Sequence, residues 1–332
     1  MIYEVGKAGE TMLKIFYHDT AGVLRESDAF IPDSVILMLA PTTAERNRVT
    51  HALGVHPAYL EEPLDLEERP RIERDDDMVS IILHFPVQML QSKEQESTIV
   101  TIPYLPRPVA LIHLPKHLVI VSPTETDLFL HVLEGRYGAV KTFMRTRLTF
   151  LVFEAIAQRF NAILEDIQYH IQRVQRSLRA AHRNRELYEL LYLGKSLTYF
   201  AASLRAMRTI YQHLLTGREL PIFENDRELL QNALIDLEQA EEVTALRGES
   251  LGQLMDAYAA IVHNNVNAVL KILTTLTVVL AIPTMIASLY ATNVSDLPWH
   301  DKVWIFPGVL ALMVIIAGSL IFFFYKKDFL RF

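Results

Sequence analysis

Two long runs without a charged residue close this chain of 332 residues, from Ile272 to Ser295 and from Val303 to Tyr325. Each run covers the roughly 20 apolar residues that a helix needs to cross about 30 Å of hydrocarbon. Because only a short segment separates the runs, we expect a membrane hairpin. Its first span is predicted at about 270–291, its loop at 292–302 and its second span at about 303–325.

The first run carries small and hydroxyl-bearing residues at alternating steps of three and four, which places them on one face of a helix. This polar stripe consists of Thr274, Thr277, Ala281, Thr284, Ser288 and Ala291. Lipid gives no reason to keep hydroxyl groups on one face, whereas a helix interface or a water-lined pore does. The spacing favours either structure, because serine and threonine stripes are also typical of ordinary helix packing.

The same spacing continues toward the N-terminus as an inner extension of the stripe. Its positions are Leu270, Asn267, His263, Ala260, Asp256, Gln253 and Glu249. A buried helix seam should be apolar, but this one carries carboxylates, amides and an imidazole, so we predict an axis lined with water. For Asp256 and Glu249 the alternative is a solvated helix face, and for His263 it is a hydrogen-bonded interface histidine.

Composition narrows the classes of function. The chain has no cysteine, which leaves neither disulfides nor thiolate metal sites, and its net charge of −7 argues against a nucleic-acid partner while suiting cations. We find no placed nucleophile, acid–base pair, phosphate loop or cofactor motif. The sequence therefore predicts that the protein is not an enzyme and needs no cofactor.

The flanking charges predict the topology. Residues 1–9 lack the apolar core of a signal peptide. Lys271 marks the inner end of the first span, and Lys326 and Lys327 open a basic tail over 326–332. Because basic residues remain on the cytoplasmic side, we expect a multi-pass protein of the cell membrane with both termini in the cytoplasm.

Before the hairpin, the pattern predicts an α+β cytoplasmic domain over 1–136 and a helical stalk over 137–266. Within the stalk, apolar repeats predict two antiparallel helices over 148–178 and 193–214. An Asn225 or Asp226 cap then opens a helix that continues to about Tyr290, which is about 100 Å at about 1.5 Å per residue. Strands are expected at 12–17, 34–39, 79–85, 98–102, 109–112 and 117–121, and helices at 42–53 and 125–133.

These landmarks resemble the CorA-type divalent-cation transporters along nearly the whole chain. The resemblance rests on the segment Asn267 to Asn293, the Leu297-Pro298 loop, the tail Tyr325-Lys326-Lys327, and upstream Leu53-Gly54-Val55-His56-Pro57, Glu62-Pro63 and Arg69-Pro70-Arg71-Ile72-Glu73. It implies a funnel-shaped homopentamer in which the long helix of each subunit lines a central pore and the second span packs outside.

The family's Gly-Met-Asn motif at the outer end of the first span is altered here to Ala291-Thr292-Asn293, after Tyr290. The resemblance assigns the asparagine to a ring of carboxamide oxygens at the pore entrance, and Asn293 supplies this group. Its alternative is an ordinary asparagine at a helix C-terminus. Alanine in place of glycine is acceptable only if the backbone there stays near helical values.

The resemblance also implies the cargo. We expect influx of a divalent cation, Mg²⁺ first and Co²⁺ or Ni²⁺ as further candidates, driven by the membrane potential. One alternative is a Zn²⁺-transporting or proton-coupled relative. A second is a non-conducting, membrane-tethered regulatory protein. Asp75, Asp76 and Asp77 precede a strand and are candidates for a regulatory Mg²⁺ site, with plain solvated surface as the other interpretation.

Overall fold

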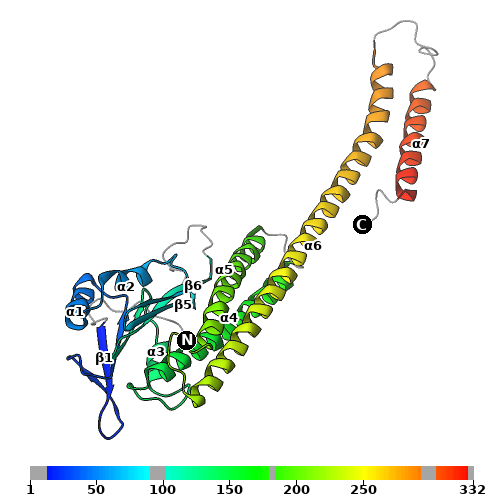
Figure 1. Cartoon of the computed structure of the whole chain (residues 1–332). Coiled ribbons are helices and arrows are strands. Elements are labelled where there is room, and N and C mark those ends of the chain that lie inside the picture. Colours follow the sequence, from blue (N-terminus) through cyan, green and yellow to red (C-terminus); the bar gives the residue numbers. More distant parts are fainter. Residues whose placement is uncertain (1–12, 90–101, 179–183, 293–303, 328–332) are drawn as a thin grey trace. The chain divides into compact units, whose positions relative to one another are not determined.

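The computed structural model describes residues 13–89, 102–178, 184–292 and 304–327 (Figure 1). It divides the chain into two compact units, 1–252 and 253–332. The predicted boundary between an α+β domain and a stalk at 136/137 falls inside the first unit, because the helices that follow it pack directly on the sheet. The boundary between units lies earlier than the predicted 266/267.

The first unit is built on a seven-stranded sheet with the order β2-β1-β3-β7-β6-β5-β4. Strands β3 and β7 run parallel, and the other described neighbours are antiparallel. The strands are β1 (Leu13–His18), β2 (Leu24–Ser27), β3 (Ser34–Leu39), β4 (Arg71–Asp75), β5 (Met78–Gln88), β6 (Tyr104–His113) and β7 (His117–Ser122).

Helices α1 (Thr43–Leu53) and α2 (Pro57–Glu61) cover one face of this sheet, and a short 3₁₀ turn, η1 (Glu62–Leu64), follows. Helix α1 begins at a capping box, in which Thr42 and Glu45 satisfy each other's backbone N–H groups. It ends at Gly54, whose φ of 71° is the left-handed conformation that favours glycine. Val49 and Leu60 then pack into an apolar cluster with the inward residues of the strands.

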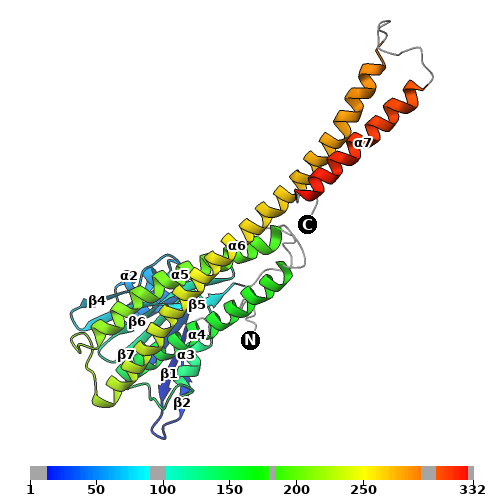
Figure 2. The same cartoon turned by 90° about the vertical axis from the view of Figure 1, so that its right-hand side faces the viewer.

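The other face is covered by α3 (Leu128–Leu133), α4 (Arg145–Leu178) and α5 (Asn184–Leu214), which Figure 2 shows beside the strands. Aromatic pairs fill these interfaces. The rings of Phe85 and Phe129 lie 5.8 Å apart between sheet and α3, and those of Phe160 and Phe200 lie 5.0 Å apart between α4 and α5. The predicted pair of long helices is therefore present, and each is longer than predicted at one end.

Helix α6 (Glu224–Tyr290) is one uninterrupted element of 67 residues, with Pro283 inside it. It begins slightly before the predicted cap and ends at the predicted residue. In the second unit its C-terminal part lies alongside α7 (Ile305–Lys326), and the two run in opposite directions (Figures 1 and 2). The predicted hairpin is thus two helices; its loop lies outside the described residues apart from Thr292.

Other departures from the sequence-based expectations have local causes. Strands β2 and β4 were not predicted because both are short and rich in charged residues. Helix α2 is too short to show a helical period. The strand predicted at 98–102 falls almost wholly outside the described residues, and β6 begins at Tyr104.

A buried histidine makes the stability of the first unit depend on pH. His113 of β6 has its Nε2 atom 2.8 Å from Thr149 Oγ1 of α4. Burial lowers the pKa of this imidazole to about 3, and Arg145 nearby adds to the effect. The unfolded side chain gains its proton near pH 6.5, whereas the folded one stays neutral until about pH 3. Stability should therefore fall as the pH falls through this window.

We expect the free energy of unfolding to lose up to about 1.4 kcal/mol per pH unit from this group below pH 6.5. Pulse proteolysis of the full chain in urea at several pH values measures the slope. The variant His113→Leu/Thr149→Val removes both polar partners and should show a shallower pH dependence. An unchanged slope would mean that His113 does not titrate as described.

Candidate functional site

Two helices have the length and composition of membrane spans. They are α6, in its apolar C-terminal part, and α7, whose apolar windows have mean hydropathies of 2.1 and 2.5. Few residues in either window are buried within the single chain, 6% and 0% respectively. Their apolar surface is therefore free to face lipid or other copies of the chain.

One face of α6 in the second unit is covered. Thr275 and Val279 are 2% and 9% exposed, and Ile282 and Ile286 on the same side are half-buried. We assign this covered face to α7, because α7 lies beside this part of α6 in both views. Thr275 donates its hydroxyl to the Lys271 carbonyl at 2.8 Å, so its polar group is satisfied within the helix.

The polar stripe lies on the opposite side of α6. All six of its residues are exposed: Thr274, Thr277, Ala281, Thr284, Ser288 and Ala291. At about 100° per residue, the stripe and the covered face lie roughly 160° apart around the helix axis. The hydroxyl-bearing side is therefore the side that α7 leaves open.

Two threonines of the stripe use their hydroxyl protons inside the helix. Thr277 Oγ1 donates to the Leu273 carbonyl oxygen at 2.8 Å, and Thr284 Oγ1 to that of Leu280 at 2.7 Å. Each of these oxygens can then only accept further hydrogen bonds, because a hydroxyl has one proton to donate and two lone pairs to accept. The exposed face therefore offers hydrogen-bond acceptors.

The outer end of α6 keeps a helical backbone. The Ala291 N–H bonds to the Ala287 carbonyl at 3.0 Å, and Ala291 does not have a positive φ. The backbone at Ala291 thus stays helical, which is the condition under which alanine can replace glycine at this position. Thr292 Oγ1 donates to the Leu289 carbonyl at 2.7 Å and so caps the last turn. Asn293 lies outside the described residues, as does the side chain of Tyr290.

The inner extension also lies along α6. Its residues Glu249, Gln253, Asp256, Ala260, His263, Asn267 and Leu270 are all exposed in the single chain. Because α6 is uninterrupted, the helical spacing that joins these residues to the polar stripe is kept. Most other residues between 252 and 274 are also exposed, so burial in one chain does not separate a pore-facing side from a solvated one.

The predicted regulatory aspartates form a tight β-hairpin. Asp75 ends β4 and pairs with Met78 of β5, and Asp76 and Asp77 make the turn between them. Asp76 has a left-handed φ of 47°, which aspartate tolerates better than most residues. In the part of the chain that the structure describes, no group of three or more acidic, histidine or cysteine side chains is arranged to hold a metal ion. Asp76 and Asp77 therefore form the turn of this hairpin, and Asp75 is the last residue of the strand before it.

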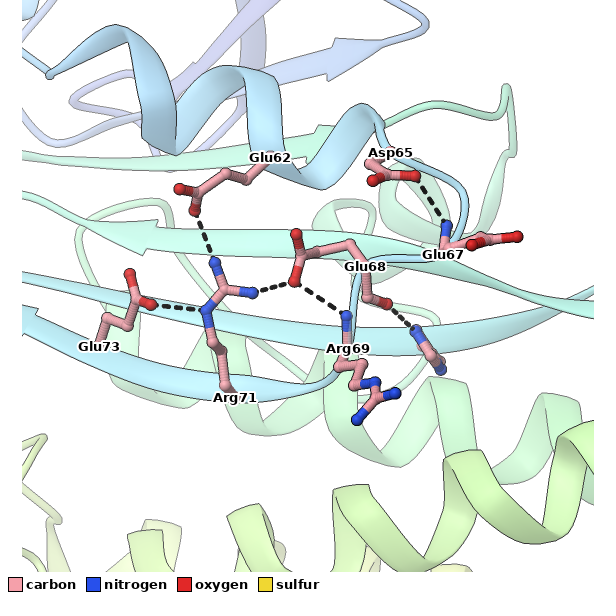
Figure 3. A network of polar contacts seen from close by, with 8 residues as sticks. Glu62, Asp65, Glu67, Glu68, Arg69, Arg71 and Glu73 are labelled. Carbon is pink, nitrogen blue, oxygen red and sulfur yellow. Dashed lines mark hydrogen bonds and ion pairs between the residues drawn. The ribbon is translucent and has the colours of Figure 1, made fainter.

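The nearby Arg-Pro-Arg-Ile-Glu segment has a structural role that sequence reasoning missed (Figure 3). Arg71 contacts three carboxylates: Glu62 and Glu73, each at 2.6 Å, and Glu68. The Glu68 carbonyl accepts from Nε2 of the half-buried His84 at 2.7 Å, and desolvation lowers the pKa of that histidine. This network fixes the segment after η1 to β4 and β5. Its signal in the sequence was a run of charged residues of both signs along 67–75.

Known proteins and a family model match nearly the whole chain. A family model described as CorA-like Mg²⁺ transporter protein matches residues 36–326. The chain is 27% identical over 297 residues to the cobalt/magnesium transport protein CorA of Methanocaldococcus jannaschii, covering 86% of this chain and 88% of that protein. It is 25% identical over 319 residues to the protein so described from Thermotoga maritima, with 94% and 87% covered.

The fold agrees as well. The complete structure of the CorA magnesium transporter from Methanocaldococcus jannaschii matches with a TM-score of 0.79 at 23% identity, covering 96% of this chain and 98% of that one. This match confirms the predicted fold class, in which an α+β domain precedes long helices and a C-terminal apolar helix.

Proposed function

Because the chain belongs to the CorA-like Mg²⁺ transporter family, we propose that the polar stripe of α6 lines a pathway for divalent cations. The family makes the protein a membrane transporter and not an enzyme. The observation that carries the proposal is the position of the stripe, exposed on the side of α6 away from its covered face. We propose Mg²⁺ as the principal cation, with Co²⁺ and Ni²⁺ also carried.

The chemistry of the stripe suits a hydrated ion. Mg²⁺ loses water reluctantly and keeps several waters in most protein sites. Those waters point their hydrogens outward, so a pathway that passes them must offer acceptors. Thr277 and Thr284 offer acceptor oxygens, because their own protons are held by backbone carbonyls. Ala281 and Leu270 then provide narrow apolar rings, which are suited to gating by dewetting.

Assembly would complete the site. We propose a homopentamer in the cell membrane with both termini in the cytoplasm, so that copies of Asn293 form a ring at the outer entrance. Asp256 and Glu249, repeated around the axis, would make acidic rings in the inner vestibule. Influx would be downhill, since one elementary charge gains about 2.3 kcal/mol per 100 mV and a divalent ion about twice that.

A natural absence of cysteine allows a direct test of the stripe. Single cysteines at Thr277 and Thr284 should react with a membrane-impermeant thiol reagent in the assembled protein. Cysteines at Val279 and Ile282, on the covered face, should react much more slowly. The rates are measured by mass spectrometry of the protein in lipid nanodiscs, with the unsubstituted chain as the blank.

The ratio of the modification rates at the two faces shows whether the stripe is in contact with water. A thiolate needs water, so a residue on a hydrated path reacts and a residue packed against α7 or lipid does not. Equal, slow reaction at all four positions would show that the stripe is sealed from water and would refute the pathway. If the same reagent blocks Mg²⁺ uptake in the stripe variants alone, the hydrated path along the stripe is also the path of transport.

A further inference from the structure

Three glycines where α5 meets α6 have different surroundings. A Cβ atom built on Gly194 of α5 would lie 3.3 Å from Leu251 Cδ2, a tight contact in which the leucine would have to shift by a few tenths of an ångström. Gly248 and Gly252 of α6 have nothing within 4 Å of such an atom. Neither has a positive φ. Neither space nor backbone conformation within the chain requires glycine at these two positions.

Both glycines follow residues that hold α6 on its neighbours. The Arg247 guanidinium donates to the Leu164 carbonyl of α4. Leu251 is 3% exposed and packs on Gly194 of α5. Gly248 and Gly252 are the next residues after each of these attachments. Beyond Leu251, the next buried residue of α6 is Thr275.

The two glycines therefore lower the stability of the α6 helix just after its contacts with α4 and α5. Glycine inside a helix loses more backbone entropy than alanine, and each one favours local opening about fivefold. The two glycines are four residues apart, about one turn, so both weaken the same stretch of the helix. In the turns that follow, between 252 and 274, the chain buries no side chain fully, so helix propensity contributes a larger share of their stability.

We propose that Gly248 and Gly252 form a built-in flexion point of α6, at which the helix bends or opens while Arg247 and Leu251 keep the preceding turns on α4 and α5. The flexion point is a property of the helix and does not rest on the route of the cation. It supplies a place where α6 changes direction without loss of the packing before it.

Close packing by a second copy of the chain would also explain two small residues four apart, since such pairs let helices approach. The two explanations predict opposite effects of alanine. At a flexion point, alanine strengthens the helix. At a tight helix contact, the added methyl groups collide with the neighbouring copy and loosen the assembly.

Hydrogen exchange of the full-length assembly in nanodiscs tests this. In Gly248→Ala/Gly252→Ala, exchange in peptides covering 244–260 should slow by about 25-fold, as two fivefold effects combine. The matched control Ala257→Gly, at an exposed position in the same helix, should speed exchange about fivefold. Unchanged or faster exchange in the double variant, or loss of the assembly by native mass spectrometry, would overturn the flexion point.

Gly194→Ala provides the contrast. Its methyl group presses on Leu251, so this variant should speed exchange in the same peptides although it also exchanges glycine for alanine in a helix. Slowing in both the Gly194 variant and the double variant would mean that alanine acts without regard to position, and would also overturn the proposal.

Discussion

Placing a fixed positive charge at Thr284 should reduce divalent-cation uptake to background. The charge is best added after assembly, by reacting Thr284→Cys with a cationic thiol reagent, so that the result does not depend on folding with a charged span. At about 6 Å and an effective dielectric constant of about 20, one such charge repels a divalent ion by about 5 kcal/mol. Repetition in every subunit makes the barrier larger still.

Uptake into proteoliposomes, measured with Mg²⁺ alone and with Co²⁺, Ni²⁺ or Zn²⁺ in competition, reports the effect. A neutral reagent of the same size controls for obstruction, and an anionic one should leave more uptake than either. If the cationic and neutral products both transport as well as the unmodified protein, Thr284 does not face the ion and the stripe does not line its path. Competition by Zn²⁺ alone would favour the zinc-transporting alternative.

Much of the membrane part could be predicted from the sequence because lipid imposes simple rules. Uncharged runs marked α6 and α7, and the spacing of hydroxyl residues placed Thr277 and Thr284 on one helix face. The covered face could not be predicted. Thr275 belongs by composition with the other threonines, yet it is buried on the covered face.

The first unit was harder to predict, since its polar residues act through partners far away in sequence. Arg71 is one charge among many in its segment, and its three carboxylate partners depend on how η1 approaches β4. The three aspartates at 75–77 suggested a metal site, and the sequence did not show that Asp76 and Asp77 form the two-residue turn between β4 and β5. Acidic residues in a row do not distinguish a ligand set from a turn.

The partner of Asp226 is also distant in sequence and could not be predicted. Replacing Asp226 should cause the largest loss of stability that we expect from a single substitution. The position of Asp226 near the start of α6 suggested a helix cap, but its carboxylate is 2.8 Å from Arg147 Nη1 of α4. Asp226 is 5% exposed, so the pair is largely withdrawn from water on the acidic side. Asp226→Ala would leave Arg147, whose side chain is 29% exposed, without its carboxylate partner, and we expect the free energy of unfolding to fall by about 1–3 kcal/mol.

Replacing both partners separates the cost of an unpaired charge from the value of the pair. Arg147→Met/Asp226→Leu removes both charges and keeps most of the volume, so it should recover most of the lost stability. Pulse proteolysis of the full chain in urea compares the three proteins. Equal losses in the single and double variants would mean that the ion pair itself joins α4 to α6. Recovery in the double variant would show that the loss in Asp226→Ala came from the unpaired Arg147 charge and not from the lost value of the pair.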